Sequence, residues 1–223
     1  MSYIINLKRD EGEREKKMFL SLVSTRGKKI LEIGCGQGYF SAILAPEAEQ
    51  LTITDISATD IKMALDILAI YDQRVQAYQA SGQDLSRFTA SSFDLVVFPY
   101  SLHHNNNPGL ALDEAWRVLK IGGEVAVIEP RHRGDYCQFL APFYSEEEKL
   151  ASADQALKKF ICSRKTSREY SVDWCFESIS DLRQLLVCSF NLSAEVLNKT
   201  LASFPASGKI IMKDLAIIWL LKK

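Results

Sequence analysis

A glycine-rich turn between a short apolar run and a helix-like run is the feature that most constrains this chain. Residues 30–40 read ILEIGCGQGYF, with a predicted strand over 29–33 and a predicted helix over 38–45. The glycines Gly34, Gly36 and Gly38 allow positive φ and leave no Cβ to block an approaching ligand. The segment therefore predicts a strand, a ligand-binding loop and a helix.

The spacing of this turn distinguishes between classes of ligand. In a dinucleotide-binding loop a third glycine follows the second by three residues, and that position is Tyr39 here. Glu32, at the end of the predicted strand, would repel phosphates and favour a cationic ligand. A nicotinamide-dependent dehydrogenase is therefore disfavoured, and we expect a ligand with positive charge.

Three later segments extend the pattern in a fixed order. LTITDIS (51–57) reads as a second strand ending in Asp55, where a carboxylate can accept two hydrogen bonds from a ribose. SSFDLVVFPYSLHH (91–104) contains a strand, and EAWRVLKIGGEVAVIEP (114–130) reads as helix, turn and strand. With the glycine turn, these segments resemble the class I S-adenosylmethionine-dependent methyltransferases, in particular the type 11-like, small-molecule subgroup. The resemblance covers roughly the first 130 residues.

The resemblance implies a fold, a cofactor and a set of binding residues. The expected fold is α/β, a doubly wound, mainly parallel seven-stranded sheet, and the expected cofactor is S-adenosyl-L-methionine. Ser81 stands where many relatives place an acid that holds the adenine amino group. The residues expected to bind the cofactor are Glu32, Gly34, Cys35 and Gly36 at its methionine end, Asp55 at the ribose, Ile56, Ser81, Gly82 and Gln83 around the adenine, and Pro99 near the methyl group.

Candidate catalytic residues follow the strand at 94–98. Tyr100 would face the reactive methyl group, and His103 and His104 lie in the loop where open parallel sheets bind their ligands. One histidine would act as general base if the acceptor arrives protonated. The alternative, in which the histidines cap or pack against the next helix, stays open. No metal site is predicted.

The rest of the chain divides into parts of one domain, residues 1–223. A cofactor-binding half spans 28–130, a mostly helical insertion without strand alternation spans 131–176, and a helix with an antiparallel strand pair spans 177–223. The strands of that pair are predicted at 188–196, from alternating apolar residues, and at 210–221. An amphipathic helix over 10–24 is expected at the edge of the sheet, where the resemblance implies that it closes over the cofactor.

The insertion is predicted to cover the acceptor site and to move during turnover. Its aromatic residues suit a lid that excludes water, although they would equally suit a surface excursion that packs on the sheet. They are Tyr136, Phe139, Phe143 and Tyr144.

Composition restricts partners and location. The 27 basic and 28 acidic residues nearly cancel, so no global field favours nucleic acid. No apolar run reaches the roughly 20 residues that a membrane span needs, and the apolar part of Met1–Leu7 is too short for a signal peptide. The five cysteines are spread without a CxxC pair and read as free thiols. We therefore expect a cytoplasmic monomer or homodimer.

The predicted function is methyl transfer to a small-molecule acceptor, with O, N and C left open as the acceptor atom. One alternative is a methyltransferase acting on RNA or protein. Enzymes that methylate amino groups of nucleic acids typically carry Asp or Asn followed by Pro-Pro-Tyr after this strand, and Phe98-Pro99-Tyr100 matches only part of that motif. A second alternative is a binding module that keeps the fold without catalysis.

Overall fold

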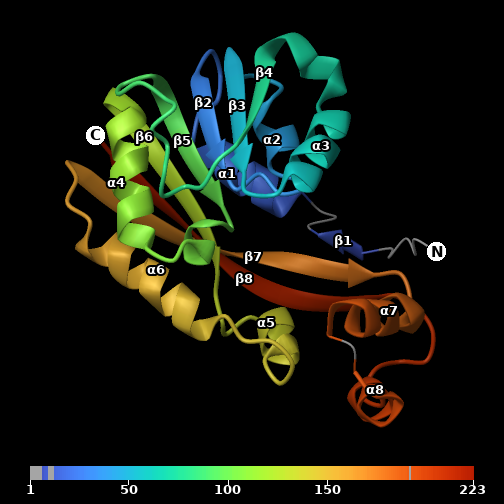
Figure 1. Ribbon diagram of the computed structural model, residues 1–223. Helices are drawn as coiled ribbons and strands as arrows, with labels where there is room; N and C mark the ends of the chain where they lie inside the picture. Colours follow the sequence, from blue (N-terminus) through green and yellow to red (C-terminus); the bar gives the residue numbers. More distant parts are fainter. Residues whose placement is uncertain (1–6, 10–12, 191) are drawn as a thin grey trace.

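The fold was analysed in a computed structural model, which describes residues 7–9, 13–190 and 192–223. One sheet of eight strands runs through it in the order β1-β7-β8-β6-β5-β2-β3-β4 (Figure 1). Seven of these strands form the predicted mainly parallel sheet, and the three-residue β1 (Leu7–Arg9) adds an eighth beside β7.

The parallel part of the sheet matches the elements predicted for 28–130. Its strands are β2 (Lys29–Ile33), β3 (Gln50–Asp55), β4 (Val75–Gln79), β5 (Phe93–Pro99) and β6 (Leu119–Pro130). Its helices are α2 (Ser41–Leu44), α3 (Ala58–Ile67), the 3₁₀ turns η1 (Ala69–Arg74) and η2 (Leu102–His104), and α4 (Pro108–Val118). The chain runs from β2 to β4 on one side and then crosses to β5, so β2 and β5 flank the point where strand order reverses. Ligands bind at such a point in open α/β sheets.

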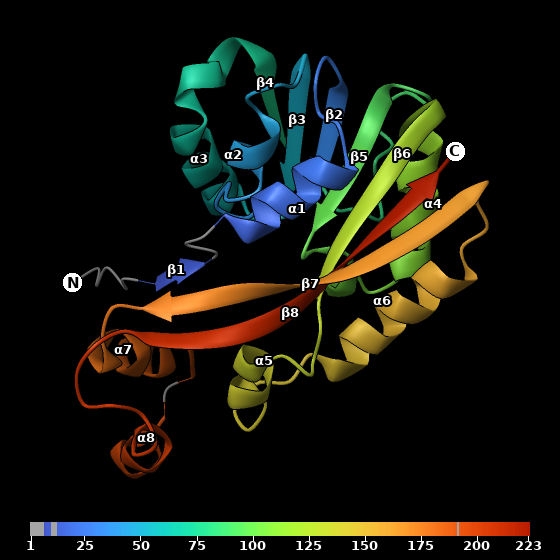
Figure 2. The same ribbon diagram turned by 180° about the vertical axis from the view of Figure 1, so that it is seen from behind.

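Helices cover both faces of this sheet, which explains the nearly continuous apolar strands. Ile30 packs toward α2, α3 and α1 (Arg14–Leu22), while its neighbour Leu31 packs toward α4 and α6 (Glu147–Lys159). Figure 2 shows α1 lying across the first of these faces. There Phe19 of α1 meets Phe40 edge to face, with ring centroids 4.9 Å apart. The predicted amphipathic helix is therefore a core element; residues 10–12 of that prediction lie outside the described residues.

The insertion predicted over 131–176 is wrong in its last third. Helices α5 (Asp135–Leu140) and α6 are followed by a thirteen-residue strand, β7 (Arg164–Phe176). Most of the first half of β7 is exposed and polar, so its sequence resembles a loop. What makes it a strand is antiparallel pairing with β8 (Ile210–Lys222) along its whole length.

The strand predicted over 188–196 is also wrong. Helix α7 (Ile179–Phe190) runs into this segment, and helix α8 (Ala194–Leu201) starts within it, where the Ser193 hydroxyl accepts a hydrogen bond from the Val196 N–H. Apolar residues at alternate positions here belong to two helix ends rather than to one pleated strand. The antiparallel pair of the sheet is therefore β7 and β8.

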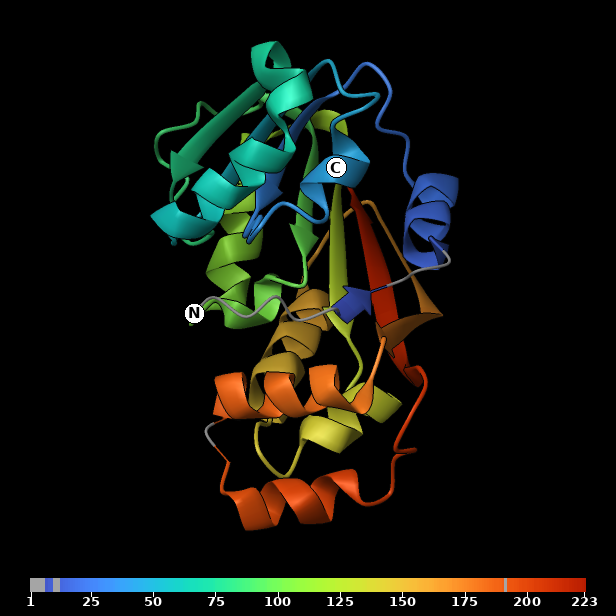
Figure 3. The ribbon, with the colours of Figure 1, turned by 90° about the vertical axis from the view of Figure 1, so that its right-hand side faces the viewer.

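The long strands β7 and β8 extend beyond the parallel sheet and carry α5, α7 and α8 at their far end (Figure 3). A third apolar cluster joins Phe176, Leu182, Leu186, Leu197 and Met212 in this extension. No helix in the described part of the chain is both long and apolar enough to cross a membrane.

Candidate functional site

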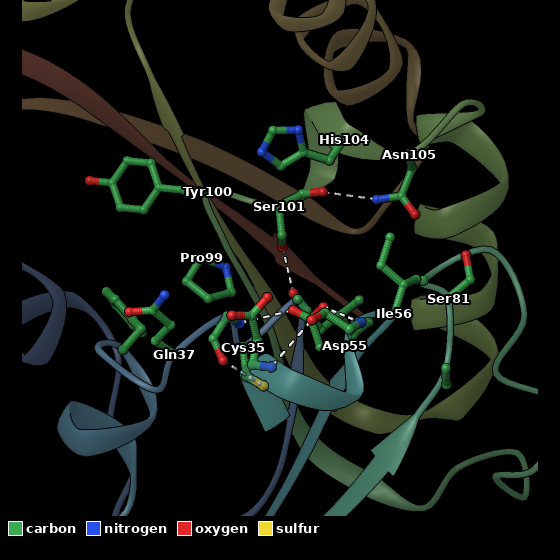
Figure 4. A pocket seen from close by; sticks show the side chains of 18 of the residues that line it. Cys35, Gln37, Asp55, Ile56, Ser81, Pro99, Tyr100, Ser101, His104 and Asn105 are labelled. Carbon is green, nitrogen blue, oxygen red and sulfur yellow. Dashed lines mark hydrogen bonds between the residues drawn. The ribbon is translucent and has the colours of Figure 1, made fainter. Parts of the chain in front are cut away.

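A cavity of about 1080 Å³ opens at the carboxyl ends of β2, β3 and β5, and we call it the loop cavity. Figure 4 shows Cys35 and Asp55 on one side of it and Tyr100 and His104 on the other. Nine of the ten predicted cofactor-binding residues line this cavity: Gly34, Cys35, Gly36, Asp55, Ile56, Ser81, Gly82, Gln83 and Pro99. Residues that are distant in sequence thus converge on one space, although binding by these residues stays a prediction.

The three glycines of the turn serve different purposes. A Cβ on Gly34 would lie 2.4 Å from Ser101 Cβ, so this glycine lets the turn approach the loop after β5. A Cβ on Gly38 would lie 2.8 Å from the backbone of Ala64 in α3. An added Cβ on Gly36, at φ +49°, would meet nothing within 4 Å, so only this glycine leaves space on the cavity wall.

Asp55 presents its carboxylate at the same wall. Its Oδ2 accepts a hydrogen bond from the Gly36 N–H and its Oδ1 one from the Ser57 N–H, both at 2.9 Å. Each oxygen keeps acceptor capacity for a ligand, because a carboxylate offers about four acceptor sites. The arrangement fits a ligand with hydroxyl groups, as predicted for a ribose.

Glu32 is the predicted residue that does not line the loop cavity. Its side chain is fully buried, and its Oε2 accepts a 2.5 Å hydrogen bond from the Ser41 hydroxyl. Burial raises the pKa of Glu32 to about 8, although the Ser41 hydrogen bond opposes the shift. Glu32, which the sequence predicts to bind the cofactor, therefore does not contact the loop cavity directly. With its raised pKa, it also does not carry a full negative charge at neutral pH.

A second cavity of about 270 Å³ adjoins the first, and we call it the aromatic cavity. Its lining includes the aromatic side chains Tyr136, Tyr144 and Trp174. Leu140 of α5 and Asp214 of β8 also line it. Tyr136 stacks on Trp174 with ring centroids 4.4 Å apart. Both cavities are also lined by Tyr100, His104 and Trp174, so the two spaces meet at these side chains.

His103 lies buried beside the aromatic cavity between two carboxylates. Its Nδ1 donates to Glu129 Oε2, and its Nε2 lies 3.4 Å from Glu146 Oε2 without forming a hydrogen bond. Burial alone would lower the pKa of His103, but Glu129 and Glu146 raise that pKa to about 9. At neutral pH this histidine is therefore the less suitable of the two as a base.

His104 differs from His103 in exposure and charge. Its side chain is 53% exposed, lies 3.5 Å from Glu146 Oε1 through Nδ1, and lines both cavities. Burial of its inner part and the neighbouring His103 lower the pKa of His104. The pKa of the neighbouring Glu146 is shifted as well. Partial burial alone would raise this pKa, but the nearby His103 and the hydrogen bond from the Tyr144 hydroxyl lower it to about 2.

Tyr100 lines both cavities, but its hydroxyl is engaged elsewhere. It donates to the buried Glu15 of α1, which also accepts a 2.7 Å hydrogen bond from Tyr170. The backbone of Tyr100 has φ +56°, an uncommon value for a residue other than glycine. A catalytic role for Tyr100 stays a prediction, and the observed contacts favour a role in shaping the wall.

The aromatic residues of the predicted cover divide into two groups. Tyr136 and Tyr144 line the aromatic cavity. Phe139 and Phe143 instead pack in the third apolar cluster, against Phe204 and Phe190. The segment is thus partly a wall and partly a packing element, and its movement stays a prediction.

Four residues in or beside the aromatic cavity were not predicted as site residues from the sequence. Trp174 and Asp214 lie on β7 and β8, whose pairing was not predicted. Glu129 ends β6 and reads as part of an apolar strand, and Glu146 reads as the start of an acidic surface run. Only the buried position of Glu129, within VIEP, gave a signal that could have singled it out.

Comparison with known proteins agrees with this geometry. Residues 31–127 match the family described as a methyltransferase domain. The chain is 30% identical over 141 residues to a demethylmenaquinone methyltransferase of Clavibacter sepedonicus, an alignment that covers 60% of the chain and 57% of the relative. It is 30% identical over 103 residues to a ubiquinone biosynthesis O-methyltransferase of Dechloromonas aromatica (strain RCB), covering 46% and 44%. The chain thus spans about half the length of the curated relatives it matches.

The fold itself is shared with solved structures. A proposed methyltransferase from Bacillus halodurans C-125 superimposes with a TM-score of 0.63 at 16% identity, covering 94% of this chain and 98% of that one. At this identity the likeness supports the architecture alone.

Proposed function

We propose that the chain transfers a methyl group from S-adenosyl-L-methionine to a small molecule, because residues 31–127 match a methyltransferase domain. The observation that carries this proposal is the junction of the two cavities at Tyr100, His104 and Trp174. The loop cavity would hold the cofactor, and the aromatic cavity would hold the acceptor.

The residues of the loop cavity fit the cofactor that the family implies. Asp55 would accept hydrogen bonds from the ribose hydroxyls, and the turn at Gly34–Gly36 would lie against the methionine end. Ser81, Gly82 and Gln83 would lie at the adenine edge. When bound, the cofactor supplies a methyl group on a positively charged sulfur.

The aromatic cavity favours a small acceptor that carries a ring. Its volume of about 270 Å³ lies just below the range for drug-sized ligands, and four aromatic side chains line it: Tyr100, Tyr136, Tyr144 and Trp174. The polar groups at the junction, His104 and Glu146, lie where an acceptor hydroxyl would enter. A ring with a hydroxyl group is consistent with the O-methyltransferase named above, so we assign transfer to oxygen.

The protein's part in this reaction is mainly positioning. An in-line displacement needs the acceptor atom and the methyl group held in contact, and such placement supplies about 7 to 11 kcal/mol in ideal cases. Trp174 and Tyr100 line both spaces and would exclude water from the junction. The proton of a hydroxyl acceptor would leave on the side of His104 and Glu146.

Two measurements test the proposal. Calorimetry should show binding of S-adenosylmethionine and of its demethylated product, and no binding of NAD. Methyl-labelled cofactor should then transfer label to members of a panel of phenols, catechols and quinols. NAD binding without a response to either sulfur compound would overturn the cofactor assignment, and label appearing only in RNA or protein would overturn the small-molecule acceptor.

A further inference from the structure

Three side chains that line the aromatic cavity, one of which also lines the loop cavity, bring ligand atoms for a metal ion together. His103 and His104 belong to η2, and Glu146 precedes α6. One nitrogen of each histidine and one carboxylate oxygen all lie within 4.8 Å of one another. Two imidazoles and one carboxylate form a donor set that binds Zn²⁺, Fe²⁺ and similar transition metals.

The spacing of these atoms suits coordination better than hydrogen bonding. His103 Nε2 lies 3.4 Å from Glu146 Oε2, and His104 Nδ1 lies 3.5 Å from Glu146 Oε1. Hydrogen bonds between nitrogen and oxygen are typically about 2.7–3.2 Å long. Tetrahedral ligands with bonds of about 2.1 Å to one ion lie about 3.4 Å from each other. The two contacts involve different oxygens of Glu146, and one ligand atom from each of the three residues lies within 4.8 Å of the others.

The surroundings of His103 favour a ligand role for its inner nitrogen. Glu129 accepts hydrogen bonds both from Nδ1 and from the backbone N–H of His103, the latter at 3.2 Å. A proton held on Nδ1 leaves the lone pair on Nε2, which is the arrangement found behind many metal-bound histidines. Nε2 is buried, makes no hydrogen bond, and belongs to a side chain that is 2% exposed.

Glu146 is held in place as well. The Tyr144 hydroxyl donates a 2.5 Å hydrogen bond to its Oε1. The carboxylate therefore approaches the two histidines from the aromatic cavity in a defined orientation, and metal ligands need such fixed orientations.

We propose that His103, His104 and Glu146 bind one divalent transition-metal ion, with Zn²⁺ as the best-suited probe, and that its open positions face the acceptor. This rests on the proposed function, since the ion would lie where the two cavities meet. Three protein ligands leave at least one position free, as in catalytic rather than structural zinc sites.

The ion would act on a hydroxyl acceptor. Contact with the ion lowers the proton affinity of the hydroxyl. The O–H bond breaks and its proton passes to water, an oxygen lone pair forms the new O–C bond, and the C–S bond breaks with its electron pair left on sulfur. One proton is released for each methyl ether formed, and no oxidant or reductant is needed.

The alternative is an ion pair of protonated His103 with Glu129 and Glu146, without metal. The two arrangements differ in their response to Zn²⁺. Tag-free protein is treated with EDTA, freed of chelator, and titrated with Zn²⁺ by calorimetry. Co²⁺ is then added in place of Zn²⁺ to record its visible absorption, which reports coordination by nitrogen and oxygen independently of activity.

The expected result is one equivalent of Zn²⁺ bound at micromolar or tighter affinity. Glu146→Gln and His104→Ala should weaken binding at least tenfold, and Glu129→Gln should weaken it by about 10- to 100-fold through the orientation of His103. Glu148→Gln and His132→Ala are matched controls, because they remove a nearby carboxylate and the remaining histidine of the chain without touching the three ligands.

Absence of stoichiometric binding, or equal affinities in Glu146→Gln and Glu148→Gln, would overturn the metal site. Titration of the same samples with S-adenosylmethionine separates this failure from that of the proposed function. Cofactor binding and transfer that persist after EDTA treatment would refute the ion's role alone, and loss of cofactor binding in the metal-loaded protein would refute the methyltransferase proposal itself.

Discussion

The loop cavity and the aromatic cavity are built in different ways. The first is lined mainly by one stretch of the chain, from Ile33 to Asn106, and depends on turns at the ends of parallel strands. The second is assembled from η2, α5, the start of α6 and the paired strands β7 and β8, and depends on side chains. The two cavities therefore depend on largely different parts of the chain, which meet at Tyr100, His104 and Trp174.

The largest effect that should separate the two regions comes from Asp55. Asp55→Ala removes the carboxylate that accepts hydrogen bonds from Gly36 and Ser57 and is predicted to bind the ribose. We expect cofactor affinity to fall by about 2 to 4 kcal/mol, or tens- to several-hundred-fold, by calorimetry.

Asp55 acts on the proposed metal ligand His104 only through its charge, so Zn²⁺ affinity should change far less than cofactor affinity. Asp66→Ala, an exposed change on the same α3 side of the molecule, is the control and should alter neither affinity. An unchanged cofactor affinity in Asp55→Ala would place the ribose elsewhere.

A smaller effect concerns the pH dependence of stability in the parallel half. The pKa of Glu32 is raised to about 8 in the folded protein, so the folded state retains a proton that the unfolded chain releases. The free energy of unfolding therefore falls as pH rises from the unfolded pKa, about 4.3, through the folded one. One such group contributes about 1.4 kcal/mol per pH unit, or about 2 kcal/mol between pH 6 and pH 7.5.

Glu32→Gln should remove this dependence, since an amide at the same position does not titrate. The measurement is urea unfolding of wild type and variant at several pH values, with Glu49→Gln as the exposed control. Parallel curves for wild type and Glu32→Gln would show that Glu32 is ionised in the folded protein at neutral pH.

The smallest effect tests whether the aromatic cavity holds the acceptor. Tyr136→Leu removes the ring that stacks on Trp174. If Tyr136 also stacks on a ring of the acceptor, losing that contact costs about 1 kcal/mol beyond burial, so kcat/KM for the acceptor should fall about fivefold with unchanged cofactor affinity. Phe139→Leu is the matched control, because Phe139 packs on Phe204 outside the cavity and should affect only stability. Equal kcat/KM values in the two variants would remove Tyr136 from the acceptor site.

Deletion of the predicted cover would not test whether it forms a lid. Replacing residues 135–165 by a linker would delete α6, whose Ala153 and Leu157 are buried against the parallel sheet. It would also remove the first residues of β7. The result would report loss of the core rather than loss of a cover, so point substitutions in the cavity wall are the sharper test.

Sequence alone determined the parallel half and the loop cavity. Positive φ at Gly34, Gly36 and Gly38 is a local property of the backbone. The strand β5, which is covered on both faces, is apolar except for Asp94, so its sequence alone predicts a buried strand. The strand ends of a doubly wound sheet meet at one edge, so Asp55 and Pro99 were predicted near the glycine turn without coordinates.

Tertiary structure alone decided the aromatic cavity and the roles of the two histidines. The polar strand β7 is stable because it pairs with β8, and local propensity carries no record of that partner. His103 meets Glu129 and Glu146 only because β6 ends beside η2 and the chain returns to it before α6. Burial then makes His103 and His104 chemically different, although they are neighbours in sequence, because desolvation and nearby charge depend on what the fold brings together.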